Sequence, residues 1–318
     1  MSGSIPNLVA KRIATAALTL LLVSVIIFSI TSLLPGDAAQ AALGQAATPE
    51  AVAALRMRLG LDQPALIRYL HWLGGLLTGD AGRSYTDGLP VDVLIGKRLP
   101  ESLLLAGLTT AVSVPLALGI GMLAAMYRGS WLDRALSVTT LSMVAVPEFL
   151  VATAGVLIFA VKLHWLSALT FVLDHPTPGQ LLHGYTLPVV SLCFVLTAQM
   201  ARMTRAALID QLSQPYSEMA ALKGIGLTRR VLVHALPNAV GPIANAIALS
   251  LSYLLGGAII VETIFDYPGV ARLMVDAVSN RDMPLLQACA MIFSTAYLGL
   301  VLIADLCAIL SNPKLRRA

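Results

Sequence analysis

The sequence predicts an all-α polytopic membrane protein with six transmembrane helices. The 318-residue chain is 57% hydrophobic and only 12% charged, and its mean hydropathy is +0.81. Soluble chains carry about 25% charged residues. Six apolar segments are each long enough to cross about 30 Å of hydrocarbon at roughly 1.5 Å per residue. This composition excludes a soluble enzyme, a disordered tail and a disulfide-rich secreted module.

The six predicted spans follow one another along the whole chain. They cover residues 13–34, 102–127, 135–163, 187–208, 239–261 and 286–310. The first span follows Lys11 and Arg12 and precedes small residues at 38–42, a pattern that also fits a signal peptide. Its apolar run is longer than the roughly 7–15 residues of a signal sequence, so we interpret it as a retained span.

Loop charges predict the orientation of these spans. With the N-terminus inside, the inner segments contain twelve Lys and Arg but only three acids, and the outer segments contain nine Lys or Arg and twelve Asp or Glu. Lys and Arg accumulate in the cytoplasmic loops of membrane proteins. We therefore expect both termini to lie in the cytoplasm.

The spans divide the chain into three regions. A cytoplasmic tail and the first span cover residues 1–34, an outer region covers 35–101, and a core of five spans covers 102–318. The outer region is long enough to contain structure of its own. Within the core, the inner loop at about 209–238 separates the fourth span from the fifth.

Two short helices are expected in the outer region. Thr48-Pro49-Glu50 has the residues of a helix start, and Gly60 marks the end of that helix, whose apolar face is Val52, Leu55 and Leu59. A second helix is expected after Pro64, with Tyr69 and Trp72 suited to the membrane interface.

The inner loop has the pattern of two helices joined by a glycine corner. Ser213 and Pro215 predict a helix start, Gly224 and Gly226 a stop, and Thr228 the cap of a second helix. That second helix carries apolar side chains at positions 231, 232, 235 and 236. Such a segment suits docking into a groove on a cytoplasmic partner. The alternative is an interfacial helix on anionic lipid.

The same loop resembles the EAA motif of binding-protein-dependent ABC importer permeases. It reads Glu218-Met219-Ala220, three residues, Gly224, nine residues, and then His234-Ala235-Leu236-Pro237. The family has Ala where Met219 stands and Ile where His234 stands, but the spacing is kept. The resemblance implies a coupling helix that sits in a cleft of a separate ATPase subunit.

The resemblance assigns roles within this loop. Gly224 is the corner, Met219, Ala220 and Leu222 are expected to fill the ATPase groove, and Glu218 reaches a backbone or cationic group of the ATPase. The complete set of predicted coupling residues is Tyr216, Glu218, Met219, Ala220, Leu222, Lys223, Gly224, Gly226, Arg229, Arg230, Leu236 and Pro237.

Further motifs resemble the dipeptide, oligopeptide and nickel permeases, and specifically the first of their two permease subunits. The resemblance implies the type I ABC importer (MetI-like) permease fold. The motifs are Leu34-Pro35-Gly36-Asp37, Leu59 to Pro64, Gly79 to Ser84, Pro90-Val91, Arg98 to Ser102, Gly256-Gly257-Ala258, Val261 to Phe265, Tyr267-Pro268-Gly269, Asn280-Arg281-Asp282 and Asn312-Pro313-Lys314.

The resemblance also implies the partners and the location of the chain. These are a second homologous permease, one or more ABC ATPases that bind ATP and magnesium, a periplasmic or lipid-anchored substrate-binding protein, and the bilayer of the bacterial inner membrane. The substrate class is peptides, with nickel chelates, glutathione and sugars as alternatives.

Other signals in the sequence are weaker. No Gly-x4-Gly-Lys-Ser/Thr loop occurs, so no cofactor is expected on this chain and we predict that it is not an enzyme. The glycines at 119–124 imitate a dinucleotide fingerprint, but they lie within a span and are interpreted as helix packing. Cys193, Cys289 and Cys307 are interpreted as core residues. The sequence has no basic run with interleaved aromatic residues, so it gives no indication of nucleic-acid binding.

Several ionisable residues have two interpretations. Pro147 and Glu148 mark a candidate hinge or pathway site within the third span, because acids there are costly. Asp305 is a weaker functional candidate, because its side chain can reach the membrane interface or pair with Arg316. The outer-loop histidines, His164, His175 and His183, have no standard metal-site spacing and are interpreted as exposed side chains.

Two rival functions differ from an importer subunit. An ion-coupled secondary transporter needs broken helices around an ion site and usually internal repeats. A membrane scaffold or receptor subunit would assemble without moving a solute. Neither explains the spacing of the inner loop together with the motifs of the outer loops.

Overall fold

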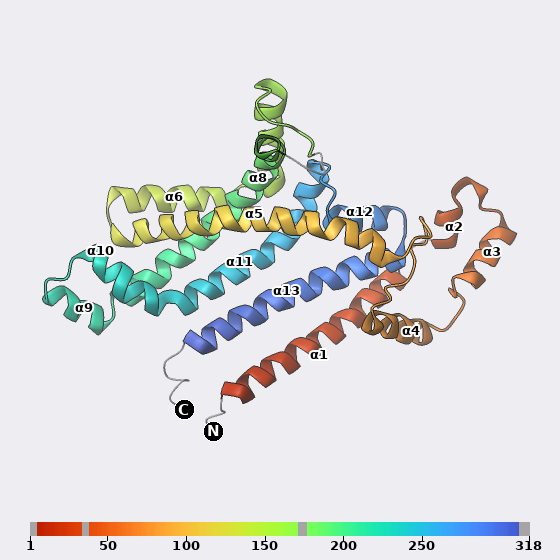
Figure 1. Cartoon of the computed structure of the whole chain (residues 1–318), viewed down its shortest axis with the longest axis horizontal. Helices are drawn as coiled ribbons and strands as arrows, with labels where there is room; N and C mark the ends of the chain where they lie inside the picture. The colour runs from red at the N-terminus through yellow and green to blue at the C-terminus, as the bar shows by residue number, and fades with distance from the viewer. Residues whose placement is uncertain (1–4, 34–37, 171–176, 312–318) are drawn as a thin grey trace. The chain divides into compact units, whose positions relative to one another are not determined.

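The computed structural model describes residues 5–33, 38–170 and 177–311. These residues are almost entirely helical and form no named strand; the single β-bridge among them joins Arg83 and Pro90. In chain order the elements are α1 (Ile5–Ser32), α2 (Ala38–Leu43), η1 (Gly44–Ala46), α3 (Pro49–Arg58), α4 (Ala65–Thr78), α5 (Val91–Met126), α6 (Trp131–Ala145), α7 (Glu148–Gly155), η2 (Val156–Lys162), α8 (Pro178–Leu212), α9 (Pro215–Leu222), α10 (Leu227–Arg229), η3 (Arg230–Ala235), α11 (Leu236–Ile264), α12 (Val270–Ser279) and α13 (Met283–Ser311) (Figure 1).

The chain separates into two compact units. Unit 1 comprises residues 1–14, 104–267 and 297–318, and unit 2 comprises residues 15–103 and 268–296. Three long helices, α1, α5 and α13, pass from one unit into the other. Because α5 begins at Val91, the region boundary predicted at 101–102 falls inside a helix.

Five helices of the described residues are long and apolar enough to cross a membrane, and a bent pair brings the number to six if the pair is one span. The bent pair is Trp131–Ala145 and Glu148–Lys162, which meet at 93°. The span predicted over 135–163 is therefore bent, and its break lies at Pro147, where a hinge was predicted. Pro147 sits at the break, where it cannot donate a helical hydrogen bond.

The helices that contain the other five predicted spans all begin earlier than predicted. The second span lies within α5, which extends back to Val91, and the fourth lies within α8, which extends back to Pro178. Thr177 and Gln180 form a reciprocal capping box at the start of α8. Hydropathy finds only the apolar part of a helix, so charged first turns such as that of α5 were assigned to loops.

The two short helices of the outer region are confirmed. Thr48 accepts a hydrogen bond from the N–H of Ala51 at 3.2 Å and caps α3, and α4 follows Pro64. The predicted apolar face of α3 is its partly buried side. Gly60 has φ +67, as a chain reversal after a helix requires.

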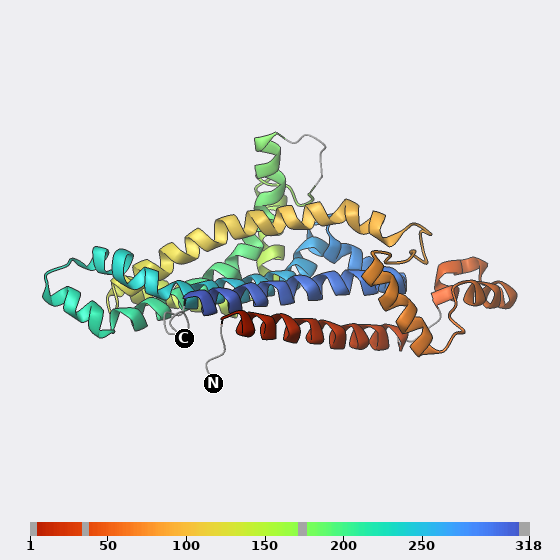
Figure 2. The ribbon, with the colours of Figure 1, turned by 60° about the horizontal axis from the view of Figure 1, so that its bottom comes forward.

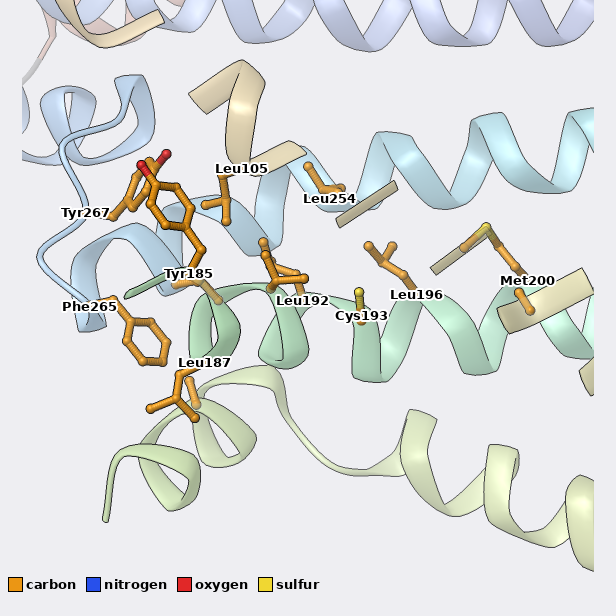
Figure 3. Packing of buried hydrophobic residues seen from close by; sticks show 14 of the residues in the cluster. Leu105, Tyr185, Leu187, Leu192, Cys193, Leu196, Met200, Leu254, Phe265 and Tyr267 are labelled. Atoms are coloured by element: carbon orange, nitrogen blue, oxygen red, sulfur yellow. The ribbon is translucent and has the colours of Figure 1, made fainter. Parts of the chain in front are cut away.

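The core of unit 1 lies along α8. Leu192, Leu196 and Met200 of this helix are completely buried and pack against side chains of α5 and α11 (Figure 3). At the α8 start, the rings of Tyr185 and Tyr267 meet edge to face, with centroids 5.7 Å apart. Cys193 and Cys289 are buried, which confirms their interpretation as core residues, whereas Cys307 is only partly buried; all three are free thiols.

Candidate functional site

The predicted coupling loop forms the connection between α8 and α11. Its α9 and α10 lie at the tip of these two helices in both ribbon views (Figures 1 and 2). The chain leaves α8 at Leu212, forms α9, turns at Gly224 and enters α10 at Leu227. The corner predicted at Gly224 is therefore present.

Hydrogen bonds at the end of α9 define this corner. The N–H of Gly224 donates to the carbonyl of Ala221 at 2.9 Å, and the N–H of Ile225 donates to the carbonyl of Ala220 at 3.1 Å. This pair of bonds is a Schellman motif. Gly224 has φ +77, a conformation that residues with a Cβ rarely adopt, while Gly226 has φ −61. Only the first glycine is required by the backbone.

The inner face of α9 consists of small residues. Ser217 is completely buried, and its Oγ accepts a hydrogen bond from Nη2 of Arg230 at 3.3 Å. Ala220 is only 6% exposed. The expectation that Ala220 fills a partner's groove is therefore wrong, because three residues after Ser217 it lies on the same inward face. Arg230 also points back to its own chain.

The outer face of α9 is apolar. Leu222 is 82% exposed and Met219 is 55% exposed, and Leu227 of α10 is also exposed. Glu218, Lys223 and Arg229 surround them as exposed charges. A convex apolar corner with a charged rim is a shape that inserts into a groove.

Tyr216 fixes the start of α9 against α8. Its hydroxyl is 2.8 Å from Oε1 of Gln211. Partial burial raises the pKa of Tyr216, with a hydrogen bond from Asn238 acting in the opposite direction. The phenol therefore keeps the proton that it donates to Gln211.

The second helix of the loop continues directly into the fifth span. α10 begins at Leu227 with Gly226 as its N-cap, so the expected Thr228 cap is wrong. π-helical turns follow at Arg230–Ala235 and lead into Leu236 and Pro237 at the start of α11. Pro237 lacks the N–H that a regular helix needs there, and π turns are frequent at such interruptions.

The break at Pro147 brings the side chain of Glu148 against α11. Glu148 is the first residue of α7, and its side chain lies against Gly257, where a Cβ would be 3.0 Å from Cδ of Glu148. Gly257 is buried, and its missing side chain creates the space for the carboxylate. The predicted hinge position and the glycine pair of the fifth span therefore meet. A role for Glu148 in the pathway stays a prediction.

An ion pair that the site prediction missed holds α6 to α8. Asp133 accepts two hydrogen bonds from Arg205, at 2.7 Å from Nε and 2.9 Å from Nη2. It also accepts the N–H of Gly129 at 2.9 Å. The two partners are 72 positions apart, so no local pattern could have paired them.

The remaining ionisable candidates have simpler positions. Asp305 pairs with Arg12 at 3.0 Å. The predicted alternative partner, Arg316, lies outside the described part of the chain, so that pairing stays a prediction. His164 and His183 are exposed, as interpreted, and His175 lies outside the described residues. Within the described ranges no three His, Cys, Asp or Glu side chains gather as metal ligands.

Two of the resemblance motifs meet in unit 2. The hydroxyl of Ser84 donates to Asp282, and the N–H of Tyr85 donates to the same carboxylate at 3.1 Å. The N–H of Leu285 donates to it at 3.5 Å. Asp282 is 1% exposed. It therefore joins the Gly79-to-Ser84 motif to the start of α13. The motifs at 34–37 and 312–314 lie outside the described residues.

Comparison with known proteins agrees with these features. The model of the family described as binding-protein-dependent transport system inner membrane component matches residues 117–317, and the model of its N-terminal part matches residues 6–106. Relatives cover nearly the whole chain. A protein of Sinorhizobium fredii named as a probable peptide ABC transporter permease is 34% identical over 309 residues, 97% of this chain and 98% of its own.

The glutathione transport system permease GsiC of Salmonella typhimurium is 35% identical over 311 residues, which are 98% of this chain and 99% of that relative. Matches of this extent, to two family models and to full-length relatives, cover both the coupling loop and the motifs that meet at Asp282. The chain therefore belongs to the family of binding-protein-dependent transport system inner membrane components, the permease subunits of ABC importers.

Proposed function

We propose that this chain pairs with a second homologous permease and forms with it the path for small peptides across the bacterial inner membrane. ATP hydrolysis on separate ATPase subunits drives the cycle, and a binding protein delivers the peptide. The observation that carries the proposal is the exposed apolar corner of Met219, Leu222 and Leu227, at a turn that Gly224 alone makes possible.

The corner is built to transmit force. Its inner face is tied to the chain by the Ser217–Arg230 hydrogen bond, and α10 continues without a loop into α11. When nucleotide closes the ATPases, their grooves move the corner, and α8 and α11 move with it. Closure of the ATPases opens the path to the outside, and hydrolysis returns the path to its inward-open state. The helices α8 and α11 thus alternate between two packed arrangements, which is alternating access.

The orientation follows from the charge asymmetry of the loops. With the coupling loop in the cytoplasm, its exposed Lys223 and Arg229 lie on the side where Lys and Arg accumulate. Both termini then lie in the cytoplasm as well, and α3 and α4 lie on the outer side. A membrane-impermeant thiol reagent applied to Lys223→Cys in sealed inverted vesicles tests this side assignment.

The substrate class rests on the relatives. One is named for peptides and another for glutathione, which is itself a small peptide with free carboxylates. Peptides are the proposed class, and glutathione is the second candidate. Competition between labelled dipeptides, longer peptides and glutathione for uptake by the reconstituted importer separates the two.

Two glycines of the coupling loop, Gly224 and Gly226, provide the mutational test. Gly224→Val places a β-branched residue at φ +77, a strain of about 1–3 kcal/mol that deforms the corner. We expect membrane insertion to be normal and substrate-stimulated ATP hydrolysis in proteoliposomes to be lost. Gly226→Val is the matched control, because Gly226 has φ −61 and both positions have open space around a Cβ.

The control should retain most transport, since its backbone conformation suits any residue. Transport by Gly224→Val at the level of the control would overturn the assignment of the corner as the coupling element.

A further inference from the structure

Unit 2 contains a pocket of about 990 Å³, which we call the α4 pocket. It lies among the end of α1, the segment from α3 to α4, the loop before α5 and the start of α13. Its lining includes Phe28, Arg58, Arg68, Trp72, Tyr85 and Gln287. The coupling loop belongs to unit 1, so the pocket is a separate feature.

One face of α4 supplies the polar wall of the pocket. Arg68, His71, Trp72 and Gly75 follow one another at helical spacing and all line it. The Nε of Arg68 and the Nε1 of Trp72 are buried, and neither atom has a hydrogen-bond partner among the described residues. Buried polar atoms of this kind normally have a partner. The same helical face therefore carries two buried donors that have no acceptor among the described residues.

Aromatic packing holds these donors in place. The guanidinium of Arg68 lies over the ring of Phe28, 5.9 Å from its centre. The rings of Phe28 and Trp72 have centroids 5.9 Å apart, and Tyr69 packs against both. The pocket thus combines a fixed cation with apolar ring surface.

The charge of the pocket is positive. Arg58 and Arg68 line it, and neither forms an ion pair with an acid of the described residues, while Nε of Arg56 lies 3.9 Å from Oδ1 of Asp62. The one acid in the lining, Asp80, already accepts the N–H of Gly82 at 2.8 Å. Burial raises the pKa of Tyr85, an effect that the charge of Arg68 opposes. Tyr85 therefore remains a neutral hydroxyl.

The rear wall of the pocket is preformed. Gln287 donates to the hydroxyl of Thr31 at 2.6 Å, which joins α13 to α1. The N–H of Asp80 donates to the carbonyl of Gly75 at 2.8 Å, and a Cβ at Gly75 would lie 2.7 Å from the carbonyl oxygen of Asp80. The loop before α5 is thereby held close to α4.

We infer that the α4 pocket binds the carboxylate of a small molecule that also carries an apolar group. Arg68 and Trp72 donate to the carboxylate, an anion that a guanidinium matches in charge and in fork geometry. The ring surface of Phe28 and Trp72 covers the adjacent apolar group. The C-terminal end of a peptide has this chemistry, and that identification rests on the proposed function.

Trp72 is itself the reporter for the test. The other two tryptophans, Trp131 and Trp165, are exposed and do not line the pocket. In the full-length Trp131→Phe, Trp165→Phe variant in lipid nanodiscs, Trp72 fluorescence is titrated with the tripeptide Ala-Ala-Phe and with its C-terminal amide. We expect a saturable change with the acid and at least tenfold weaker binding of the amide.

A matched pair of cation variants assigns the site. Arg68→Gln should weaken binding of the acid tenfold or more, to the level of the amide. Lys97→Gln, which removes an exposed cation outside the pocket lining, should bind as the parent does. Equal binding of acid and amide by the parent, or unchanged acid binding by Arg68→Gln, would overturn the inference.

The acid–amide comparison needs no substitution in the pocket, so it stands even if Arg68→Gln folds poorly. Uptake by the assembled importer separates this inference from the proposed function. Peptide uptake without any preference for the acid at Trp72 would overturn the inference that the α4 pocket binds a carboxylate, and would leave the proposed function intact. No peptide uptake at all, with selective binding of the acid at Trp72, would overturn the proposed peptide transport and leave the α4 pocket as a carboxylate site.

Discussion

In the coupling loop, the side-chain contact that ties the corner to its chain joins Ser217 and Arg230, which are 13 positions apart. In unit 2, the contact between Ser84 and Asp282 joins residues 198 positions apart. The loop leaves an apolar face exposed, whereas Asp282 is completely enclosed. In the proposed function the first region offers a surface to a partner, whereas the contacts of the second join segments of its own unit.

This difference determines what a substitution does in each region. The corner depends on a local backbone conformation and on exposed side chains, so changes there should affect partners and leave stability nearly intact. Asp282 collects donors from two distant segments, and its loss leaves buried N–H and O–H groups without acceptors. Changes there should affect folding first.

The largest expected effect is at Asp282. Asp282→Ala removes the acceptor of Ser84, Tyr85 and Leu285, and we expect a loss of about 3 kcal/mol or more in the free energy of unfolding. Thermal unfolding of the purified chain in detergent measures it. The control is Asp276→Ala, which removes a partly exposed pair with Arg272 one helical turn away. Such pairs contribute about 0.5 kcal/mol or less, so equal losses in the two variants would contradict the account.

A smaller effect is expected at the ion pair of α6 and α8. Arg205→Gln leaves the buried Asp133 with one cation fewer, at a cost of about 2 kcal/mol. Arg202→Gln, on the exposed side of the same helix, should be close to neutral. In a double-mutant cycle, Asp133→Asn with Arg205→Gln should cost clearly less than the sum of the single changes. Strict additivity would show that the pair contributes nothing.

The smallest expected effect distinguishes the two glycines at 256 and 257. Gly256→Ala should stabilise α11 by about 0.5–1 kcal/mol, because the site is exposed with open space around a Cβ. Gly257→Ala should lack this gain, because the carboxylate of Glu148 must move. Adding Glu148→Ala should restore the gain at 257. Melting temperatures measure all three variants, and equal gains at 256 and 257 would disprove the close approach of Glu148.

The parts of the molecule that were predicted from sequence depend on local signals. Apolar runs identified the spans, the Thr48 cap identified α3, and glycine spacing identified the corner at Gly224. The break of the third span was visible only as Pro147 followed by Glu148. Its angle of 93° depends on packing that no local pattern records.

Contacts between distant segments were not predictable. Asp133 with Arg205, Glu148 with Gly257 and Ser84 with Asp282 each join parts of the chain that only the fold brings together. The inward orientation of Ala220 was missed for a related reason. A motif gives the spacing of residues along a helix, but the rotation of that helix depends on what it packs against.

The central claim is that the exposed corner at Leu222 binds the ATPase. The most direct test is purification of the tagged chain from its native membranes in mild detergent, with mass identification of every retained subunit, for the parent and for Leu222→Asp. The account predicts that the parent retains a second permease and the ATPase, and that Leu222→Asp retains the second permease but loses the ATPase. Equal retention of the ATPase by both, or its absence from the parent, would contradict the claim.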